Sequence, residues 1–292
     1  MDKCNLCPRK CNVDRGAGER GYCGMPCLPR VARASLHMWE EPCISGERGS
    51  GTIFFSGCSL KCVYCQNYKI SHENYGKDIS VHRLTEIIRE LEEKGAHNIN
   101  FVSPTHYSHI IKEVLTKYRP SVPVIYNCSG YERVETLRSL EGLIDIYLTD
   151  LKYFDGDVSK KYSGAEDYFQ YAQKAVLEMQ RQVGKNIFDE KGMMQKGLII
   201  RHLVLPGNLL QTEKILSWIR NNLPEDTMLS LMSQYTPCGE ADKFKELSGK
   251  LTESEYNKAL DYLYLSNIEN GYVQEISSSD EMYIPPFDSE GV

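Results

Sequence analysis

Three cysteines lie on one short segment of the chain, at the spacing Cys-x3-Cys-x2-Cys: Cys58, Cys62 and Cys65. Thiolates this close along a chain can each bind one iron of a [4Fe–4S] cluster, whereas a cluster ligated entirely by protein needs a fourth residue. Catalytic metal sites keep an open coordination position, and structural sites close all of theirs. The spacing therefore favours a cluster with one open iron. A structural zinc site completed by another cysteine is the alternative.

A second group of cysteines lies near the start of the chain. Cys4, Cys7, Cys11 and Cys23 are separated by several glycines, which let a backbone turn tightly around a compact metal centre. We expect these four to hold a second metal centre, either structural zinc or an auxiliary iron–sulfur cluster, with Cys27 as a spare ligand. Reduced thiols without metal are the alternative.

The cysteine count argues for metal over disulfides. The chain has 292 residues and eleven cysteines, nine of which fall before residue 66. A reducing cytosol disfavours disulfides, and short cysteine spacings in an intracellular chain point to metal. The other three cysteines stand alone and are expected to pack as small apolar residues; they are Cys43, Cys128 and Cys238.

Composition excludes some classes of partner. The net charge of −6 gives no reason to expect nucleic acid or an anionic membrane as partner. No apolar run approaches the roughly 20 residues that span a bilayer, and the N-terminus has no apolar core of a secretory signal. We expect a cytoplasmic enzyme.

From residue 51 onward, apolar strand candidates alternate with amphipathic helices. This alternation predicts a parallel sheet with right-handed crossovers. The turn at residues 189–192 indicates a hairpin before the fifth strand, and Thr252 to Glu255 form a capping-box pattern that opens a late helix. Strands are expected at 52–56, 99–102, 123–127, 144–148, 198–204 and 228–232, and helices near 80–91, 107–118, 131–141, 166–183 and 210–222.

Residues 1–50 differ from the rest of the chain because they show no sustained helical or strand period. We expect them to form a cysteine-rich segment ordered largely by metal. The predicted organisation is therefore a metal-binding segment at 1–50 and a β/α domain at 51–292.

Polar residues follow each predicted strand, where sites form in parallel β/α folds. One of the neighbours Arg201 and His202 is expected to point inward, while Asp150 and Lys152 could instead be an exposed ion pair of little weight. The candidates at this edge are Ser103, Thr105, Asn127, Asp150, Lys152 and His202.

The cysteine loop and the β/α series after it resemble the radical SAM superfamily. The resemblance implies a partial (β/α)6 barrel and a [4Fe–4S] cluster whose open iron is chelated by S-adenosylmethionine. It also implies reductive cleavage to a 5′-deoxyadenosyl radical that abstracts hydrogen from a substrate, with a one-electron donor such as flavodoxin or ferredoxin. A non-catalytic iron–sulfur carrier or zinc-stabilised binding module is the rival, but it leaves the polar strand ends unexplained.

Within that superfamily, Thr149-Asp150-Leu151-Lys152 is similar to a motif of the pyruvate formate-lyase-activating group, which acts on glycyl radical enzymes. The leader Cys-x-Leu-Cys-Pro-Arg-x-Cys resembles that of one branch of this group, and residues 201–207 resemble its segment after the fifth strand. The resemblance implies that S-adenosylmethionine contacts Asp150, Lys152 and His202, with the backbone around Tyr64 near the adenine.

One departure from the activases concerns the substrate. Activases carry Gly-Gly-Glu after the second strand, and this chain has Ser103-Pro104-Thr105-His106 instead. Hydroxyls or carbonyls would then hold the S-adenosylmethionine amine, and a small molecule or peptide is an alternative substrate to a protein glycine.

Overall fold

The computed structural model describes residues 3–275 and 285–292. Six parallel strands pair in the order in which they occur along the chain. This is the predicted series of β/α units, and each strand lies within a few residues of its expected range. They are β2 (Ser50–Phe55), β4 (Ile99–Val102), β5 (Val124–Cys128), β6 (Ile146–Asp150), β8 (Met194–Leu203) and β9 (Met228–Met232).

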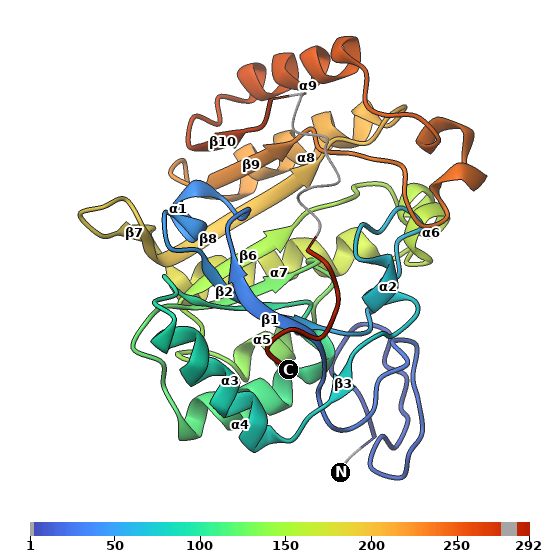
Figure 1. Ribbon diagram of the computed structural model, residues 1–292. Coiled ribbons are helices and arrows are strands. Elements are labelled where there is room, and N and C mark those ends of the chain that lie inside the picture. Colours follow the sequence, from blue (N-terminus) through green and yellow to red (C-terminus); the bar gives the residue numbers. More distant parts are fainter. Residues whose placement is uncertain (1–2, 276–284) are drawn as a thin grey trace.

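Further strands extend the sheet at both ends. β10 (Gly271–Val273) pairs parallel with β9, and β1 (Arg30–His37) pairs antiparallel with both β2 and β3 (Lys77–Asp78). β10 and β3 are the two end strands of the sheet, and they lie far apart (Figure 1). The sheet is therefore an open partial barrel, which confirms the predicted fold class.

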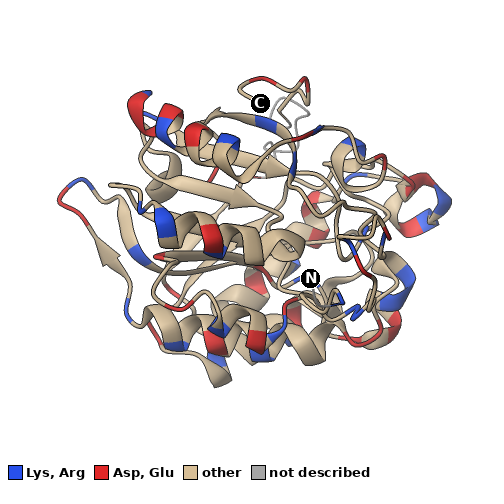
Figure 2. Cartoon of the chain, turned by 90° about the horizontal axis from the view of Figure 1, so that it is seen from below, with Lys and Arg blue, Asp and Glu red and all other residues tan. Residues whose placement is uncertain are grey.

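Helices cover the outer face of the sheet. α3 forms where a helix was predicted near 80–91, and it buries Leu84, Ile87, Ile88 and Leu91 on one face. Ser80 caps it by accepting a hydrogen bond from the Arg83 amide. Outward helix faces carry interspersed acidic and basic residues (Figure 2). The helices are α3 (Val81–Glu93), α4 (Ser108–Lys117), α5 (Val134–Arg138), α6 (Gly156–Ser163), α7 (Tyr168–Val183), α8 (Leu209–Asn222) and α9 (Glu253–Ser266).

A short helix closes the barrel at the end where the parallel strands begin. α1 (Pro42–Ser45) places Cys43 and Ile44 against residues that start their strands, such as Ile146 of β6 and Met228 of β9. β1 delivers the chain to this end, because its last residue, His37, pairs with the first residue of β2. The opposite end, where the strands stop, is left for the site.

β1 lies within residues 1–50, where the sequence showed no sustained strand period. Its arginines Arg30 and Arg33 obscure the alternation of apolar residues, and the acids that neutralise them are distant in sequence. Arg30 pairs with Asp78, and Arg33 pairs with Asp288 and Glu290 of the C-terminal tail. The sheet therefore includes part of the segment that was expected to depend on metal.

The structure confirms some of the remaining local predictions and differs from others. The hairpin is confirmed, because β7 (Ile187–Phe188) pairs antiparallel with β8. The capping box at Thr252 is also confirmed. The helix expected at 131–141 is only the short α5, and α6, α2 (Tyr68–Ser71) and three short 3₁₀ turns were not predicted. Within the described residues, no helix combines the length and apolar character that a bilayer crossing requires.

Candidate functional site

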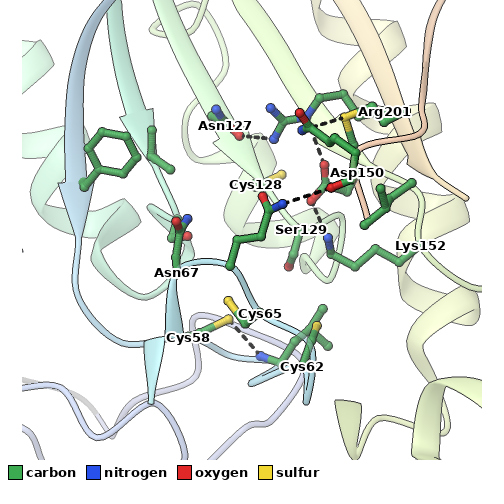
Figure 3. Close-up of a pocket in the computed structure, with 18 of the residues that line it drawn as sticks. Cys58, Cys62, Cys65, Asn67, Asn127, Cys128, Ser129, Asp150, Lys152 and Arg201 are labelled. Carbon is green, nitrogen blue, oxygen red and sulfur yellow. Dashed lines mark hydrogen bonds and ion pairs between the residues drawn. The ribbon is translucent and has the colours of Figure 1, made fainter. Parts of the chain in front are cut away.

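A cavity of about 230 Å³ opens where the parallel strands end. The three cysteines lie at one end of it, and Asn127, Asp150, Lys152 and Arg201 lie opposite (Figure 3). Apolar side chains complete the wall between the two ends. Other residues that line it are Trp39, Glu40, Phe54, Tyr64, Val102, Ser103, Cys128, Met232 and Gln234.

Each cysteine sulfur on the loop accepts a hydrogen bond. The Leu60 amide lies 3.3 Å from Cys58 Sγ, the Ser163 hydroxyl 3.0 Å from Cys62 Sγ, and the Ser71 hydroxyl 3.2 Å from Cys65 Sγ. Donors aimed at sulfur stabilise a thiolate, and they tune the potential of an iron–sulfur cluster. The donor set therefore fits a cluster ligated by these three residues.

Burial affects the protonation of the cysteine thiols. It raises the pKa of the Cys58 thiol, and it raises the pKa of Cys65 to about 12. Without a cation both thiols are neutral at pH 7, so cluster assembly must release their protons.

The spacing of the side chains also bears on the zinc alternative. Among the described residues, no three His, Cys, Asp or Glu side chains converge closely enough to hold a single ion. A zinc ion needs its sulfurs about 2.3 Å from one point, whereas a cluster places each sulfur on a different iron. The same holds for Cys4, Cys7, Cys11 and Cys23, so neither group of cysteines is arranged around one ion.

The N-terminal segment holds the cysteine loop in place. Arg9 donates from Nε to the Ser59 carbonyl at 2.8 Å and from Nη2 to the Ser163 carbonyl at 2.9 Å. Its guanidinium lies 3.9 Å above the ring of Tyr22, whose hydroxyl donates to the Leu60 carbonyl at 3.2 Å. The segment that carries the first four cysteines therefore packs directly against the loop.

Asp150, Lys152 and Arg201 form a partly buried charge network on the opposite wall. Lys152 Nζ lies 2.6 Å from Asp150 Oδ2, and Arg201 Nε lies 3.0 Å from Asp150 Oδ1. The side chains of Lys152 and Asp150 are 20% and 14% exposed, which excludes the alternative that they form an exposed ion pair.

The ion pairs keep this network charged. Burial opposes ionisation of Asp150, but the adjacent Lys152 and Arg201 outweigh it and lower its pKa. Burial likewise opposes the charge of Lys152, and Asp150 more than compensates, so the pKa of Lys152 is raised. The wall therefore presents fixed charges of both signs to the cavity.

Glu40 joins this network from the turn between β1 and α1, and it was not predicted. Its Oε2 lies 3.1 Å from Arg201 Nη1, and its Oε1 accepts from the side-chain amides of Asn100 at 2.9 Å and Asn127 at 3.1 Å. Burial raises the pKa of Glu40, although Arg201 works against that shift. No local motif marks Glu40, because its partners lie on three different strands.

Tyr64, Ser103, Asn127, Asp150 and Lys152 line the cavity as expected. Ser103 adopts a left-handed backbone (φ 57°), an uncommon conformation for a residue with a side chain, at the turn after β4.

The prediction that His202 faces the cofactor is wrong. His202 lies on the outer face of β8, where its ring bonds the Leu151 carbonyl at 2.7 Å and the Thr212 hydroxyl at 2.9 Å. Neighbours on a strand point to opposite faces, so Arg201 occupies the cavity instead.

The prediction that Thr105 lies at the cavity is also wrong. It is not among the residues that line the cavity, and its hydroxyl donates to the carboxyl group of Glu132, which is fully buried. The 3₁₀ turn Thr105–Tyr107 carries it under the loop. Sequence position after β4 could not distinguish Ser103, which faces the cavity, from Thr105, which faces away.

The first four cysteines lie near enough to one another to interact electrostatically. Cys7 and Cys23 are buried, and Cys4 and Cys11 are partly buried. Burial is the largest cause that raises the pKa of Cys7 to about 12, and the neighbouring Glu132, Cys23 and Cys11 contribute to the same shift. A Cβ at Gly21 would lie 2.9 Å from Cys11 Sγ, so only glycine allows this close approach. Their role as ligands stays a prediction.

Comparison with known proteins agrees with this geometry. A family model described as the radical SAM superfamily matches residues 52–218, more than half of the chain. A protein of Methanocaldococcus jannaschii described as uncharacterized is 32% identical over 275 residues, which are 91% of this chain and 75% of that protein.

Solved structures resemble the chain in fold. SuiB from Streptococcus suis bound to the precursor peptide SuiA superposes with a TM-score of 0.50 at 13% identity, over 75% of this chain and 46% of that one. Methylornithine synthase gives a TM-score of 0.49 at 13% identity, over 76% of this chain and 70% of that one.

Glu132 behind the Ser103 loop yields a prediction about pH. Burial raises its pKa from 4.5 to about 8. Between those values the unfolded chain loses this proton and the folded chain keeps it, so this group makes the free energy of unfolding fall as pH rises. We expect Glu132→Gln to remove a fall on the order of 2–4 kcal/mol between pH 5 and pH 8.5.

Urea unfolding followed by circular dichroism at the two pH values measures this difference. Glu141→Gln, which alters an exposed carboxylate, should keep the wild-type pH dependence. Parallel pH curves for Glu132→Gln and the wild type would show that Glu132 is ionised in the folded chain.

Proposed function

The chain belongs to the radical SAM superfamily, and from that premise we propose that Cys58, Cys62 and Cys65 bind the [4Fe–4S] cluster at which S-adenosylmethionine is reductively cleaved. One observation carries the proposal: a single cavity has three cysteines at one end and a fixed charge network at the other. Members of this family use a one-electron donor, and we propose a flavodoxin or ferredoxin for this role.

Held by Cys58, Cys62 and Cys65, a [4Fe–4S] cluster would supply the electron for reductive cleavage of S-adenosylmethionine, the chemistry by which this family abstracts hydrogen from a substrate. The chain's own part is to bind and orient. The amino and carboxylate groups of S-adenosylmethionine would chelate the open iron, and we assign the remaining charge of the carboxylate to the Lys152 ammonium, because a carboxylate favours a cation beside it. Ser103 and Asn127 supply polar groups for the ribose.

Exclusion of water is the second part of the chain's role. Phe54 and Val102 are buried and line the cavity beside the cysteine loop, and Tyr64 lies within the loop itself. The Tyr64 hydroxyl bonds that of Tyr153 at 2.6 Å, which fixes its ring. A dry wall strengthens the electrostatic contacts and protects a reactive radical from side reactions.

The cleavage reaction is the first test. Anaerobically reconstituted protein reduced with dithionite should convert S-adenosylmethionine into 5′-deoxyadenosine, measured by liquid chromatography. Alanine at Cys58, Cys62 or Cys65 should lower the rate at least about 100-fold. Losing a residue that only hydrogen-bonds to a metal ligand costs up to about 100-fold, and losing the ligand itself should cost at least as much. Cys43→Ala, at the closed end of the barrel, should keep the wild-type rate. A reducible cluster without 5′-deoxyadenosine formation in the wild type would refute the proposal.

For the substrate, we propose a glycine of a glycyl radical enzyme. The motif Asp150-Leu151-Lys152 supports this choice, since Asp150 and Lys152 face the cavity as such a motif would require. The turn at Ser103 counts against it, because a carboxylate is missing where the activases carry one. A small molecule or peptide is therefore the second candidate.

A glycyl radical is directly detectable. Co-incubation of the reduced enzyme and S-adenosylmethionine with a candidate glycyl radical enzyme should produce a doublet in the electron paramagnetic resonance spectrum. Replacing the acceptor glycine of the partner with alanine should abolish the doublet. Turnover of S-adenosylmethionine without a doublet for any candidate partner would favour the small molecule or peptide.

For the N-terminal cysteines, we propose a second metal centre ligated by Cys4, Cys7, Cys11 and Cys23. Their proximity and the close packing at Gly21 support it. A variant with Cys58, Cys62 and Cys65 all replaced by alanine should still bind about one zinc or about four irons per chain. Adding Cys7→Ser and Cys23→Ser should remove that metal, measured by plasma mass spectrometry. A triple variant that binds neither metal would refute this centre.

A further inference from the structure

A second hollow lies beside the active cavity, and the cluster and S-adenosylmethionine do not explain it. It has a volume of about 290 Å³ and shares Trp39, Glu40 and Gln234 with the first. Its remaining wall comes mostly from the turn after β1 and from α1. The residues that line only this hollow are Met38, Pro42, Ser45, Gly46 and Gln274.

These residues lie outside the part of the chain that the family model matches, residues 52–218. The parts that the superfamily shares bind the cluster and the cofactor. The second hollow lies beside the same cavity but is built from other segments. It is therefore placed to recognise the substrate, which is particular to this chain.

Carboxyl groups and cations lie side by side on the wall of the first hollow. Glu40 and Asp150 line it together with Arg201 and Lys152. Burial raises the pKa of Glu40, and Arg201 opposes that shift. Glu41, which is not among the residues that line either hollow, is buried too, and burial raises its pKa as well. His37, also on the wall, is neutral because burial lowers its pKa to about 4.

A cation that binds beside Glu40 would offset the burial that disfavours the charged form of its carboxyl group. Glu40 is the carboxylate that reaches both hollows, and Trp39, the residue before it, is 54% exposed at their rim. An indole beside a carboxylate suits an organic cation, because the ring face and the anion attract the same charge. Met38 and Pro42 add apolar surface for an aliphatic stem.

We propose that the second hollow is a substrate subsite for an organic cation, a primary ammonium or guanidinium on an aliphatic stem, with Glu40 as the residue that binds it. The inference rests on the proposed function, since it places the substrate beside the cavity that the three cysteines face. Glu40 is held in place by Arg201, Asn100 and Asn127, so the carboxylate is positioned before the substrate arrives.

Calorimetric titration of the reconstituted protein, saturated with S-adenosylmethionine, tests this subsite with defined probes. n-Butylammonium and n-butylguanidinium should bind at least about tenfold more tightly than the neutral butyramide. Acetyl-glycyl-lysyl-glycine amide carries the same ammonium on a peptide. A peptide that binds more tightly than the free amine indicates a protein substrate, and the reverse indicates a small molecule.

Variants locate the binding. Glu40→Gln should abolish the preference for cations, whereas Glu47→Gln, an exposed carboxylate shortly after Glu40 in the chain, should keep it. Trp39→Leu should weaken cation binding about threefold to tenfold, and Trp39→Phe should restore most of it. If Glu40→Gln does not fold, the two Trp39 variants still test the subsite, because Trp39 is largely exposed and its replacement should not disturb folding.

Equal affinity for the cations and butyramide would overturn the subsite. So would a preference for cations that disappears once S-adenosylmethionine is bound, because Glu40 would then serve the sulfonium. Formation of 5′-deoxyadenosine is measured on the same samples. A cation preference without that product would refute the proposed function and leave the subsite standing.

Discussion

The loop that carries Cys58, Cys62 and Cys65 lies between a strand and a one-turn helix, so its shape depends on contacts from outside. Arg9 and Tyr22 from the N-terminal segment hold its carbonyls, and Ser163 from α6 donates to a cysteine sulfur. Where the loop begins, a Cβ at Gly57 would lie 2.3 Å from the Met25 side chain. Three sulfurs can face one cavity only while these distant segments stay packed around them.

This constraint explains why the first part of the chain belongs to the active site even though the family model begins at residue 52. The first residues support the cysteine loop from one side. Further along, β1 extends the sheet, and the turn after it brings Glu40 to the cavity. In Figure 1 the N-terminal segment lies beside α2 and below α6, close to the loop it supports.

A second consequence concerns the charge network. Burying Asp150, Lys152, Arg201 and Glu40 together costs desolvation energy, which is offset only while each charge keeps its partners. Arg201 is central, because it contacts both Asp150 and Glu40. The network runs from the wall that faces the cysteines to the second hollow. Cofactor and substrate would therefore contact residues of the same charge network.

Much of this structure could be predicted from local patterns in the sequence. The cysteine spacing is local, and the strands alternate regularly with helices, so the loop and the six parallel strands were predictable. Asp150 and Lys152 followed from their place at a strand end. Arg201 and His202 show the limit: they are adjacent, and only pairing with neighbouring strands decides which one faces inward.

Features fixed by contacts between distant residues were not predictable. β1 was missed because Asp78, Asp288 and Glu290 neutralise its arginines. Glu40 was missed because Asn100, Asn127 and Arg201 come from separate strands. Thr105 was assigned to the cavity because its partner Glu132 lies beyond the next strand.

The central claim is that one iron of the cluster is open and that S-adenosylmethionine occupies it. The most direct measurement is electron–nuclear double resonance on the reduced, reconstituted protein with S-adenosylmethionine labelled with ¹⁵N in its amino group and ¹⁷O in its carboxylate. Both labels should show hyperfine coupling to the cluster. An intact cluster with bound S-adenosylmethionine and no coupling to either label would contradict it.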